Sequence, residues 1–235
     1  MVAEAEGGSD LLGALRVETD RVAGLLAGGE PDAAVPACPG WTLRHLGEHL
    51  AAVHRWGAAA VRAGGERVAM ADPELVGDVA DHYAAAAGDL LEALGGTRPD
   101  AQAWGFGPPP RTAGFWARRQ LHETTVHRWD VQQALRRPVD AVPAVQAADG
   151  IDEVLTVFVS RRLRSGPPLP VSIRLRAVEG GDWRIGDGEP AAAVTGPAQQ
   201  LFLLLWGRVD PTAPGVRIAG DQQAAVRVLE AGLTP

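Results

Sequence analysis

The chain has 235 residues, 46% hydrophobic and 22% charged, which is enough for one large or two small globular domains with a hydrophobic core. Its net charge of −7 argues against general nucleic-acid binding, and it has no lysine to form a Schiff base or a P-loop phosphate contact. Its single cysteine suits a reducing cytoplasm, and we expect neither a signal peptide nor a membrane span, which would need roughly 20 apolar residues.

Apolar residues recur at helical spacing in four segments before residue 140, and each segment is predicted to be an amphipathic helix. Thr42 is the predicted N-cap of the second helix. The four helices are expected over residues 10–27, 42–62, 74–94 and 113–136. Four such helices favour an antiparallel bundle, an architecture that builds metal sites from inward-facing side chains.

The pattern changes in the second part of the chain, after a Pro-containing linker. Residues 145–163 are predicted to be a helix, and residues 171–177 alternate apolar and polar side chains as a strand does. Further strands are expected at 183–185, 191–195 and 216–218, and further helices at 197–206 and 221–229. The predicted class is therefore α+β, with a four-helix bundle in residues 1–140 and a small α+β domain with an antiparallel sheet in residues 141–235.

Glu123 and His127 stand four residues apart in the fourth predicted helix, so they lie about 40° apart on one face. The same face carries core residues such as Trp116 and Val131. A carboxylate aimed into a core is costly unless it is compensated, and a divalent metal compensates it. His49 lies on the apolar stripe of the second helix and offers a third ligand. Two histidines, one carboxylate and one open position form a known catalytic zinc arrangement.

Other interpretations of these residues stay open from the pattern alone. A Glu-x-x-x-His pair is common on solvated helix faces. His45 and His49 are also four residues apart, although His45 lies near the helix start, where imidazole often serves the terminus. Cys38 is a rival ligand, but a lone cysteine is more often a small packing residue. His54 points away from His49 around the helix, and His82 is interpreted as a surface residue.

Three motifs resemble those of the mycothiol-dependent maleylpyruvate isomerase family. The first is Cys38-Pro-Gly-Trp-Thr-Leu-Arg-His-Leu-Gly-Glu-His49, followed by His54-Arg-Trp56. The second is His122-Glu-Thr-Thr-Val-His-Arg-Trp-Asp130, and a less specific third is Leu203-Leu-Leu-Trp-Gly-Arg208. The resemblance covers essentially the whole chain in the right order. It implies a DinB-like four-helix bundle followed by a domain related to sterol-carrier-protein-like folds.

The resemblance also implies a metal centre, a cofactor and an activity. Its metal ligands would be His49, Glu123 and His127, the metal zinc or another divalent ion, and the cofactor mycothiol. The family uses an arginine of the C-terminal domain near the active site; Arg208 is our choice and Arg217 its rival, although Arg208 also fits a cation at a helix end. The implied enzyme is an isomerase or thiol transferase with small-molecule partners, no nucleic acid and no membrane, acting as a monomer or weak homodimer.

In the expected chemistry, metal coordination lowers the pKa of a low-molecular-weight thiol, and its thiolate adds to an electrophilic carbon. Arg111 is the expected anion contact to the cofactor if the loop 104–111 forms a pocket wall; otherwise this loop only connects two helices. Two other classes stay open. One is a hydrolase that uses zinc-bound water. The other is a non-catalytic binding protein whose metal site is closed by a fourth ligand, Cys38 or His45.

Overall fold

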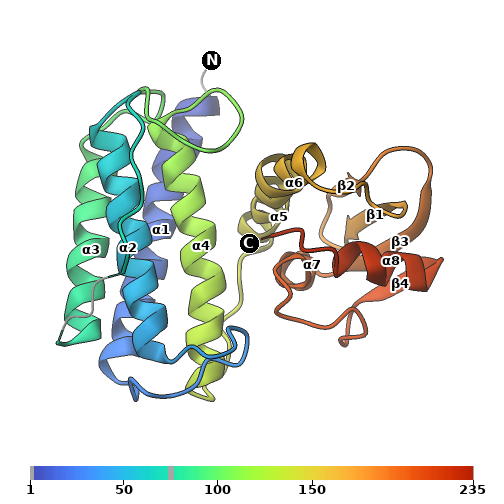
Figure 1. The fold of residues 1–235 in the computed structure, drawn as a ribbon, viewed down its shortest axis with the longest axis horizontal. Coiled ribbons are helices and arrows are strands. Elements are labelled where there is room, and N and C mark those ends of the chain that lie inside the picture. The colour runs from blue at the N-terminus through green and yellow to red at the C-terminus, as the bar shows by residue number, and fades with distance from the viewer. Residues whose placement is uncertain (1–2, 74–76, 235) are drawn as a thin grey trace. The chain divides into compact units, whose positions relative to one another are not determined.

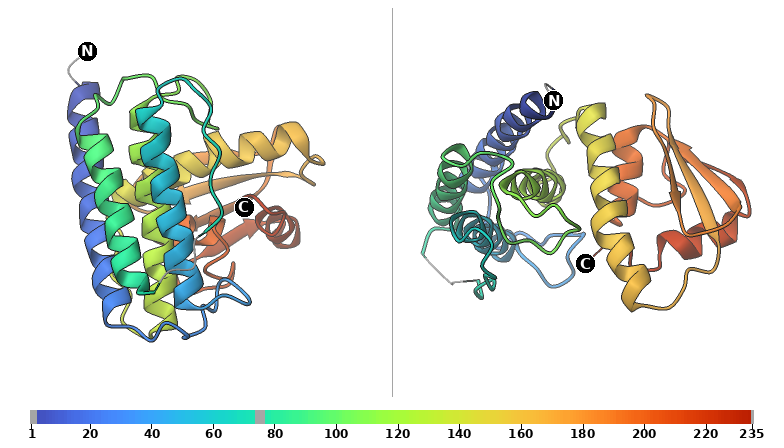
Figure 2. Two further views of the ribbon diagram at one scale, coloured as in Figure 1. Left: turned by 60° about the vertical axis from the view of Figure 1, so that its left-hand side comes forward. Right: turned by 90° about the horizontal axis from the view of Figure 1, so that it is seen from above.

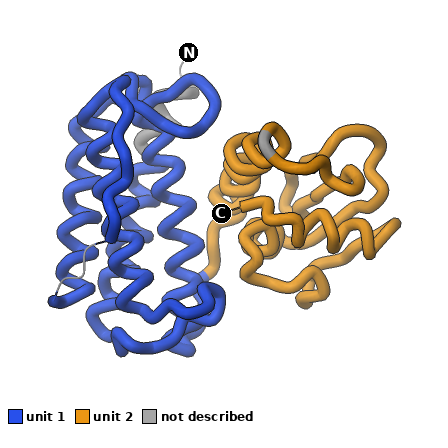
Figure 3. Tube along the Cα trace, viewed as in Figure 1, with its two compact units in different colours: residues 1–140 blue, residues 141–235 orange. Residues whose placement is uncertain are grey.

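The computed structural model describes residues 3–73 and 77–234 of the chain. The chain divides into two compact units, residues 1–140 (unit 1) and residues 141–235 (unit 2), which Figure 3 distinguishes by colour. Unit 1 contains four long helices, and unit 2 combines shorter helices with a four-stranded sheet (Figure 1). The predicted α+β class is confirmed.

The four helices of unit 1 pack side by side as a bundle, seen from above in the right-hand view of Figure 2. Their bounds are α1 Ala3–Ala27, α2 Leu43–Arg62, α3 Val79–Gly95 and α4 Ala113–Ala134. Helix α1 contacts α3 and α4, and α2 contacts the same two helices. Helices α1 and α2 therefore occupy opposite corners, and α2 and α4 share the interface where the predicted metal ligands lie.

Helix α3 begins later than its apolar pattern predicts. Asp78 is the N-cap, and its carboxylate accepts hydrogen bonds from the backbone N–H groups of Ala80 and Asp81 at 2.8 and 3.0 Å. The first backbone N–H groups of a helix have no acceptor within the helix. An N-cap aspartate accepts hydrogen bonds from them, so it stabilises a first turn that begins at Val79. The predicted helix start, residues 74–76, lies outside the described residues. Thr42 is the N-cap of α2, as predicted.

The helix directions differ from a bundle in which every neighbour is antiparallel. Three contacts show that α2 and α3 run parallel, because the residue numbers of the partners increase together. Arg44 contacts Gly77 just before α3, Arg55 contacts His82, and Arg62 contacts Asp89. The segment after α2 returns along that helix, where Trp56 Nε1 donates to the carbonyl of Val68. This long return places the start of α3 beside the start of α2. Helices α2 and α4 are antiparallel, as expected.

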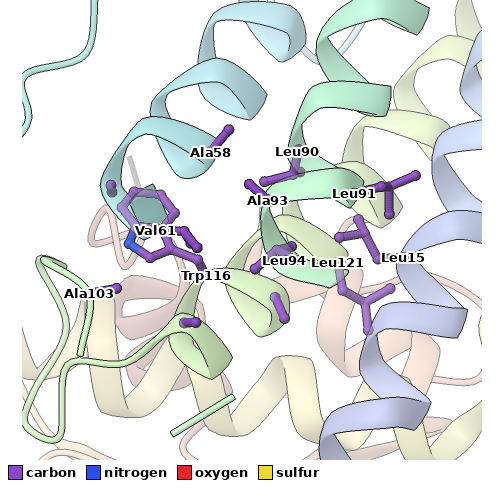
Figure 4. Packing of buried hydrophobic residues seen from close by; sticks show 13 residues of the cluster. Leu15, Ala58, Val61, Leu90, Leu91, Ala93, Leu94, Ala103, Trp116 and Leu121 are labelled. Carbon is purple, nitrogen blue, oxygen red and sulfur yellow. The ribbon is translucent and has the colours of Figure 1, made fainter. Parts of the chain in front are cut away.

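The core of unit 1 is built from apolar side chains of all four helices. Figure 4 shows one cluster, in which Leu15, Ala58, Leu90 and Trp116 come from α1, α2, α3 and α4 respectively. A second cluster includes Leu46 and other fully buried residues: Val22, Leu50, Tyr83 and Val131. These two clusters hold the helices in register, because burying each large side chain contributes about 1.5–3 kcal/mol.

Unit 2 begins with a continuous helical segment and then forms its sheet. The segment contains α5 Ala144–Glu153, a π-helical stretch η1 Val154–Val159, and α6 Ser160–Ser165. The remaining elements are β1 Ser172–Ala177, β2 Asp182–Ile185, β3 Pro190–Gly196, α7 Ala198–Leu205, β4 Arg217–Gly220 and α8 Gln222–Leu229. The predicted single helix over 145–163 is thus interrupted by a wider turn, which apolar spacing does not reveal.

The sheet of unit 2 is mixed, so the prediction of an antiparallel sheet is wrong. The strand order is β2-β1-β3-β4. Strands β1 and β2 are antiparallel, β1 and β3 are parallel, and β3 and β4 are antiparallel. Alternation of apolar and polar residues fixes which face of a strand is buried, but not which neighbour it pairs with. In β1 that alternation is as predicted, with Ile173 and Leu175 buried and Arg176 exposed.

In the part of the chain that the structure describes, no helix is both long enough and apolar enough to span a bilayer.

Candidate metal centre

Three predicted ligand side chains meet between α2 and α4. His49 comes from the second turn of α2, and Glu123 and His127 from successive turns of α4. Glu123 Oε1 is 3.2 Å from His49 Nε2 and 3.4 Å from His127 Nε2. The two imidazole rings stand nearly perpendicular, at 79°, with centroids 5.3 Å apart. One carboxylate oxygen therefore faces one nitrogen from each helix.

The spacing of these donor atoms fits a small divalent ion. Zinc binds histidine nitrogen and carboxylate oxygen at about 2.0–2.2 Å, so neighbouring ligand atoms of a tetrahedral site stand about 3.3 Å apart. The separations of 3.2 and 3.4 Å from Glu123 Oε1 match this value. The three donor atoms all lie within 4.8 Å of one another. Three protein ligands leave a fourth tetrahedral position for another molecule, as catalytic zinc sites do.

A buried arginine compensates the carboxylate from its other side. Arg119, one turn before Glu123 on α4, donates through Nη2 to Glu123 Oε2. Burial favours a higher pKa for Glu123, but the Arg119 charge and the hydrogen bonds with His127 and His49 outweigh it and hold the pKa well below its usual value. Glu123 is therefore ionised, with Oε2 paired and Oε1 directed at the two imidazoles.

A buried aspartate holds His127 in the same way. Asp130, which is fully buried, lies three residues after His127, and its Oδ2 is 2.8 Å from His127 Nδ1. Burial favours a lower pKa for His127, but the bonds with Asp130 and Glu123 outweigh it and raise the pKa to about 9. The sequence analysis did not select Arg119 or Asp130. Both lie on the predicted core face of α4, four residues before and seven residues after Glu123, and this spacing is the signal that could have found them.

His54 lies apart from the donor set, as predicted from its helical angle. It is fully buried; its Nδ1 is 2.7 Å from Gln120 Oε1, and its Nε2 is 3.4 Å from the hydroxyl of Tyr83. Burial lowers the pKa of His54 to about 4, although the Gln120 bond opposes the shift. His54 is therefore neutral at pH 7, when Nδ1–H donates to Gln120. Burial also raises the pKa of Tyr83, so its hydroxyl keeps its proton.

The rival ligands have other partners. His45 Nδ1 accepts a hydrogen bond from the backbone N–H of Thr42 at 3.1 Å, so His45 serves the α2 terminus. Cys38 Sγ lies 4.0 Å from Asp130 Oδ2 and belongs to a second donor group with His127 and Asp130. Cys38 Sγ and His127 Nδ1 thus both face the same oxygen, Asp130 Oδ2.

The two arginines predicted to contact anions, Arg111 and Arg208, lie in different units of the chain. Arg111 lies just before the start of α4, and the stretch from Ala113 to Glu123, near the middle of that helix, spans about 15 Å along the axis. Its Nε is 3.5 Å from the carbonyl of Gly107. Arg208 follows α7 in unit 2, and its Nη1 donates to the carbonyl of Trp206 at 2.8 Å.

His82 was predicted to be exposed, and this prediction is wrong. The side chain is buried, and its Nε2 is 2.8 Å from Arg55 Nη1. His82 lies three residues after Val79 and four before Ala86, on the buried stripe of α3, so the apolar spacing of that helix already indicates an inward position.

Comparison with known proteins finds a family match within each unit. The family description "Mycothiol maleylpyruvate isomerase N-terminal domain" matches residues 12–132, and "MDMPI C-terminal domain" matches residues 146–227. Among curated proteins, two uncharacterized proteins of Mycobacterium tuberculosis, one from each of two strains, are 30% identical over 243 aligned positions. Each alignment covers 94% of this chain and 94% of the relative.

The fold is similar to two solved structures of a mycothiol-dependent maleylpyruvate isomerase, one of them a histidine-to-alanine mutant. The mutant matches with a TM-score of 0.70 and the other structure with 0.67. Both are 14% identical to this chain, and both comparisons cover 90% of this chain and 92% of the other. The two family matches, which follow one another along the chain, show that the chain belongs to the mycothiol-dependent maleylpyruvate isomerase family.

Proposed function

We propose that this protein is a mycothiol-dependent enzyme with a divalent metal, zinc by preference, that adds a low-molecular-weight thiol to an electrophilic carbon of a small molecule. The observation that carries the proposal is the donor set of His49, Glu123 and His127, whose separations of 3.2 and 3.4 Å match a tetrahedral site. Membership of the family supports the choice of thiol. Two nitrogen donors and one oxygen donor favour zinc among the common ions.

The protein's own residues act by binding, orienting and balancing charge. His49, Glu123 and His127 would hold the ion, which when bound supplies positive charge that favours the thiolate over the thiol. Glu123 carries one negative charge toward the ion, and Arg119 balances the oxygen that faces away. The donor set thus keeps a net positive charge at a divalent ion, which suits an anionic sulfur.

The proposed reaction is addition of sulfur to an activated double bond. In an isomerase the carbon–sulfur bond forms as the double bond becomes single, and after rotation the same bond breaks to restore the double bond. In a transferase a proton is added to the neighbouring carbon, and the sulfur stays on the product. We further propose that Arg208 binds a carboxylate of the substrate, because guanidinium pairs with carboxylate in bidentate geometry.

The structure favours this open centre over a closed, structural one. A closed site needs a fourth protein ligand, and the two predicted for that role were Cys38 and His45. His45 Nδ1 is bonded to Thr42 N, and Cys38 Sγ lies against Asp130 Oδ2. A hydrolase using zinc-bound water would share the open centre, and only thiol dependence separates it from the proposed enzyme.

The donor set is tested by metal analysis of the purified protein. We expect one divalent ion per chain, and loss of that ion in His49→Ala, Glu123→Ala and His127→Ala. His45→Ala is the matched control, because it removes an imidazole one turn from His49 and should keep full occupancy. Full occupancy in all three ligand variants would show that the ligand assignment is wrong.

The activity is tested by adding mycothiol and maleylpyruvate and following the conjugated absorbance. A change that requires both thiol and metal supports the isomerase. If the absorbance does not change, mass spectrometry of thiol adducts with other electrophiles tests the transferase. Turnover that is the same without thiol would support the hydrolase instead.

Arg208 has its own test within the same assay. We expect Arg208→Ala to raise KM for a carboxylate substrate while metal content stays complete. Arg217→Ala is the paired variant, since Arg217 is the rival on β4. An unchanged KM in Arg208→Ala would remove Arg208 from the substrate site.

A further inference from the structure

Asp130 has an unusual environment for a carboxylate that ligates nothing in the proposed centre. It is fully buried on α4, yet burying a carboxylate is costly unless its charge is paired. Its Oδ2 lies 2.8 Å from His127 Nδ1, the ring nitrogen on the far side from the donor set. The i, i+3 spacing on α4 places the carboxylate over one edge of the imidazole.

This contact determines which nitrogen of His127 is available. A neutral imidazole carries one N–H and one lone pair, and the partner of one nitrogen sets the state of the other. A carboxylate only accepts hydrogen bonds when ionised, so Asp130 selects the form with the proton on Nδ1. The lone pair is then on Nε2, which lies 3.4 Å from Glu123 Oε1 on the side of the donor set.

We propose that Asp130 is a positioning residue of the metal centre, which fixes the ring orientation and the tautomer of His127 so that Nε2 binds the ion. The inference rests on the proposed metal centre and goes beyond it, since it assigns a role to a residue that does not ligate. A carboxylate behind a metal-binding histidine has the required chemistry, because it orients the ring and makes the nitrogen more basic.

The charge of Asp130 offers a simpler explanation, which the experiment must separate from positioning. A negative charge near a divalent ion raises its affinity whether or not it touches His127. Asp130→Glu keeps that charge but moves the carboxylate by one methylene, so it weakens binding only if position matters. Asp130→Asn keeps the shape but replaces the anionic acceptor by a neutral amide.

The measurement is Zn²⁺ affinity of the full chain, in competition with a chromophoric chelator. We expect Asp130→Asn and Asp130→Glu each to bind Zn²⁺ about 10- to 100-fold more weakly than the unsubstituted protein, as the loss of such a partner does elsewhere. Co²⁺ serves as a spectroscopic probe of the same site. We expect its visible absorption to shift in both variants, because the ring of His127 is no longer held in one orientation.

Two controls separate this role from folding and from general charge. Thermal unfolding with a chelator present reports whether each variant folds without metal, and the isosteric Asp130→Asn serves if the larger glutamate prevents folding. Asp89→Asn removes a carboxylate that pairs with Arg62 at the exposed end of α2, about 20 Å along the helix from His49, and should bind Zn²⁺ normally.

The outcomes distinguish this inference from the metal centre itself. Unchanged Zn²⁺ affinity and an unchanged Co²⁺ spectrum in the folded Asp130→Asn variant overturn the positioning role and leave the centre intact. Weakened binding in Asp130→Asn with normal binding in Asp130→Glu overturns it as well, because charge alone then accounts for the effect. Absence of Zn²⁺ binding by the unsubstituted protein overturns the centre and the role of Asp130 together.

Discussion

Helices α4 and α7 are both buried, but their buried residues have opposite chemistry. In α4, nine of the fifteen buried residues are polar or charged, whereas the six buried residues of α7 are all apolar. Apolar burial stabilises a fold, while each buried charge costs free energy unless it is paired. The difference teaches that the core of unit 1 contains paired polar and charged side chains along α4. In unit 2, α7 contributes to stability through apolar burial.

The largest expected effect comes from breaking a buried ion pair of unit 1. Arg128 is fully buried, and its Nε lies 2.5 Å from Oε2 of the buried Glu18 on α1. Arg128→Met leaves that carboxylate without its cation, so we expect a loss of about 3–5 kcal/mol in the free energy of unfolding, measured by urea denaturation. The double variant with Glu18→Leu should recover most of it. A single variant that loses less than about 1 kcal/mol would contradict the view that α4 depends on paired charges.

An apolar truncation in α7 gives the matching test in unit 2. Leu201 is fully buried. Leu201→Ala removes buried methyl groups and leaves a cavity, so we expect a loss of about 2–5 kcal/mol, measured in the same denaturation experiment. The loss should be the same at pH 5 and pH 7, because no charge is involved. A strong pH dependence of the loss would show that a titrating group, and not only apolar burial, contributes to the stability of α7.

The buried His54 predicts a pH dependence of stability that belongs to unit 1. Its pKa is about 4 in the folded protein, against 6.5 for an unperturbed histidine. The unfolded chain therefore binds the extra proton first, and stability falls as the pH drops from 6.5 to about 4, by up to about 3 kcal/mol. His54→Gln should remove this loss. His127 titrates above this window, because its pKa is raised to about 9. Equal slopes in both proteins would refute the assignment to His54.

Arg119 tests how the charge of Glu123 is balanced without metal. Arg119→Met removes the cation from Glu123 Oε2, so we expect the metal-free protein to lose about 2 kcal/mol. Added Zn²⁺ should then raise the unfolding temperature more than in the unsubstituted protein, because the ion replaces the missing charge. A smaller rise would indicate that Arg119 holds the carboxylate in place for the ion.

The smallest effect is expected for an exposed pair of unit 2. Arg174 on β1 donates to Asp182 on β2, and both side chains are exposed to solvent. Solvent and salt screen such pairs, so Arg174→Ala should not change the urea midpoint measurably. A clear destabilisation would show that unit 2 also depends on charge pairing, which would weaken the contrast between α4 and α7.

Local patterns predicted the helices and the helix faces on which the proposed ligands lie, because both are short-range features. The spacing of Glu123 and His127 places them on one face whatever surrounds the helix, and the apolar stripe around His49 indicates which face is buried. Thr42 was found as an N-cap from residue type alone. These features need only the geometry of one helix, so the sequence contains them directly.

The features that the sequence did not reveal depend on contacts between elements. The parallel direction of α3 beside α2 is one such feature, because no pattern in α3 alone records the direction of its neighbour. The parallel pairing of β1 with β3 is hidden for the same reason. Asp130 was overlooked because a carboxylate three residues from a histidine is common on exposed helices, although it shares the face of Glu123 and His127.

Four of the five residues that shape the donor set lie on one uninterrupted helix: Arg119, Glu123, His127 and Asp130. Their mutual spacing is therefore maintained by the backbone hydrogen bonds of α4, independently of loops. A twelve-residue stretch of this helix can be transplanted into another bundle in which the facing helix runs antiparallel to it. The recipient would need one added histidine on the facing helix, in the position of His49, to reproduce the complete arrangement.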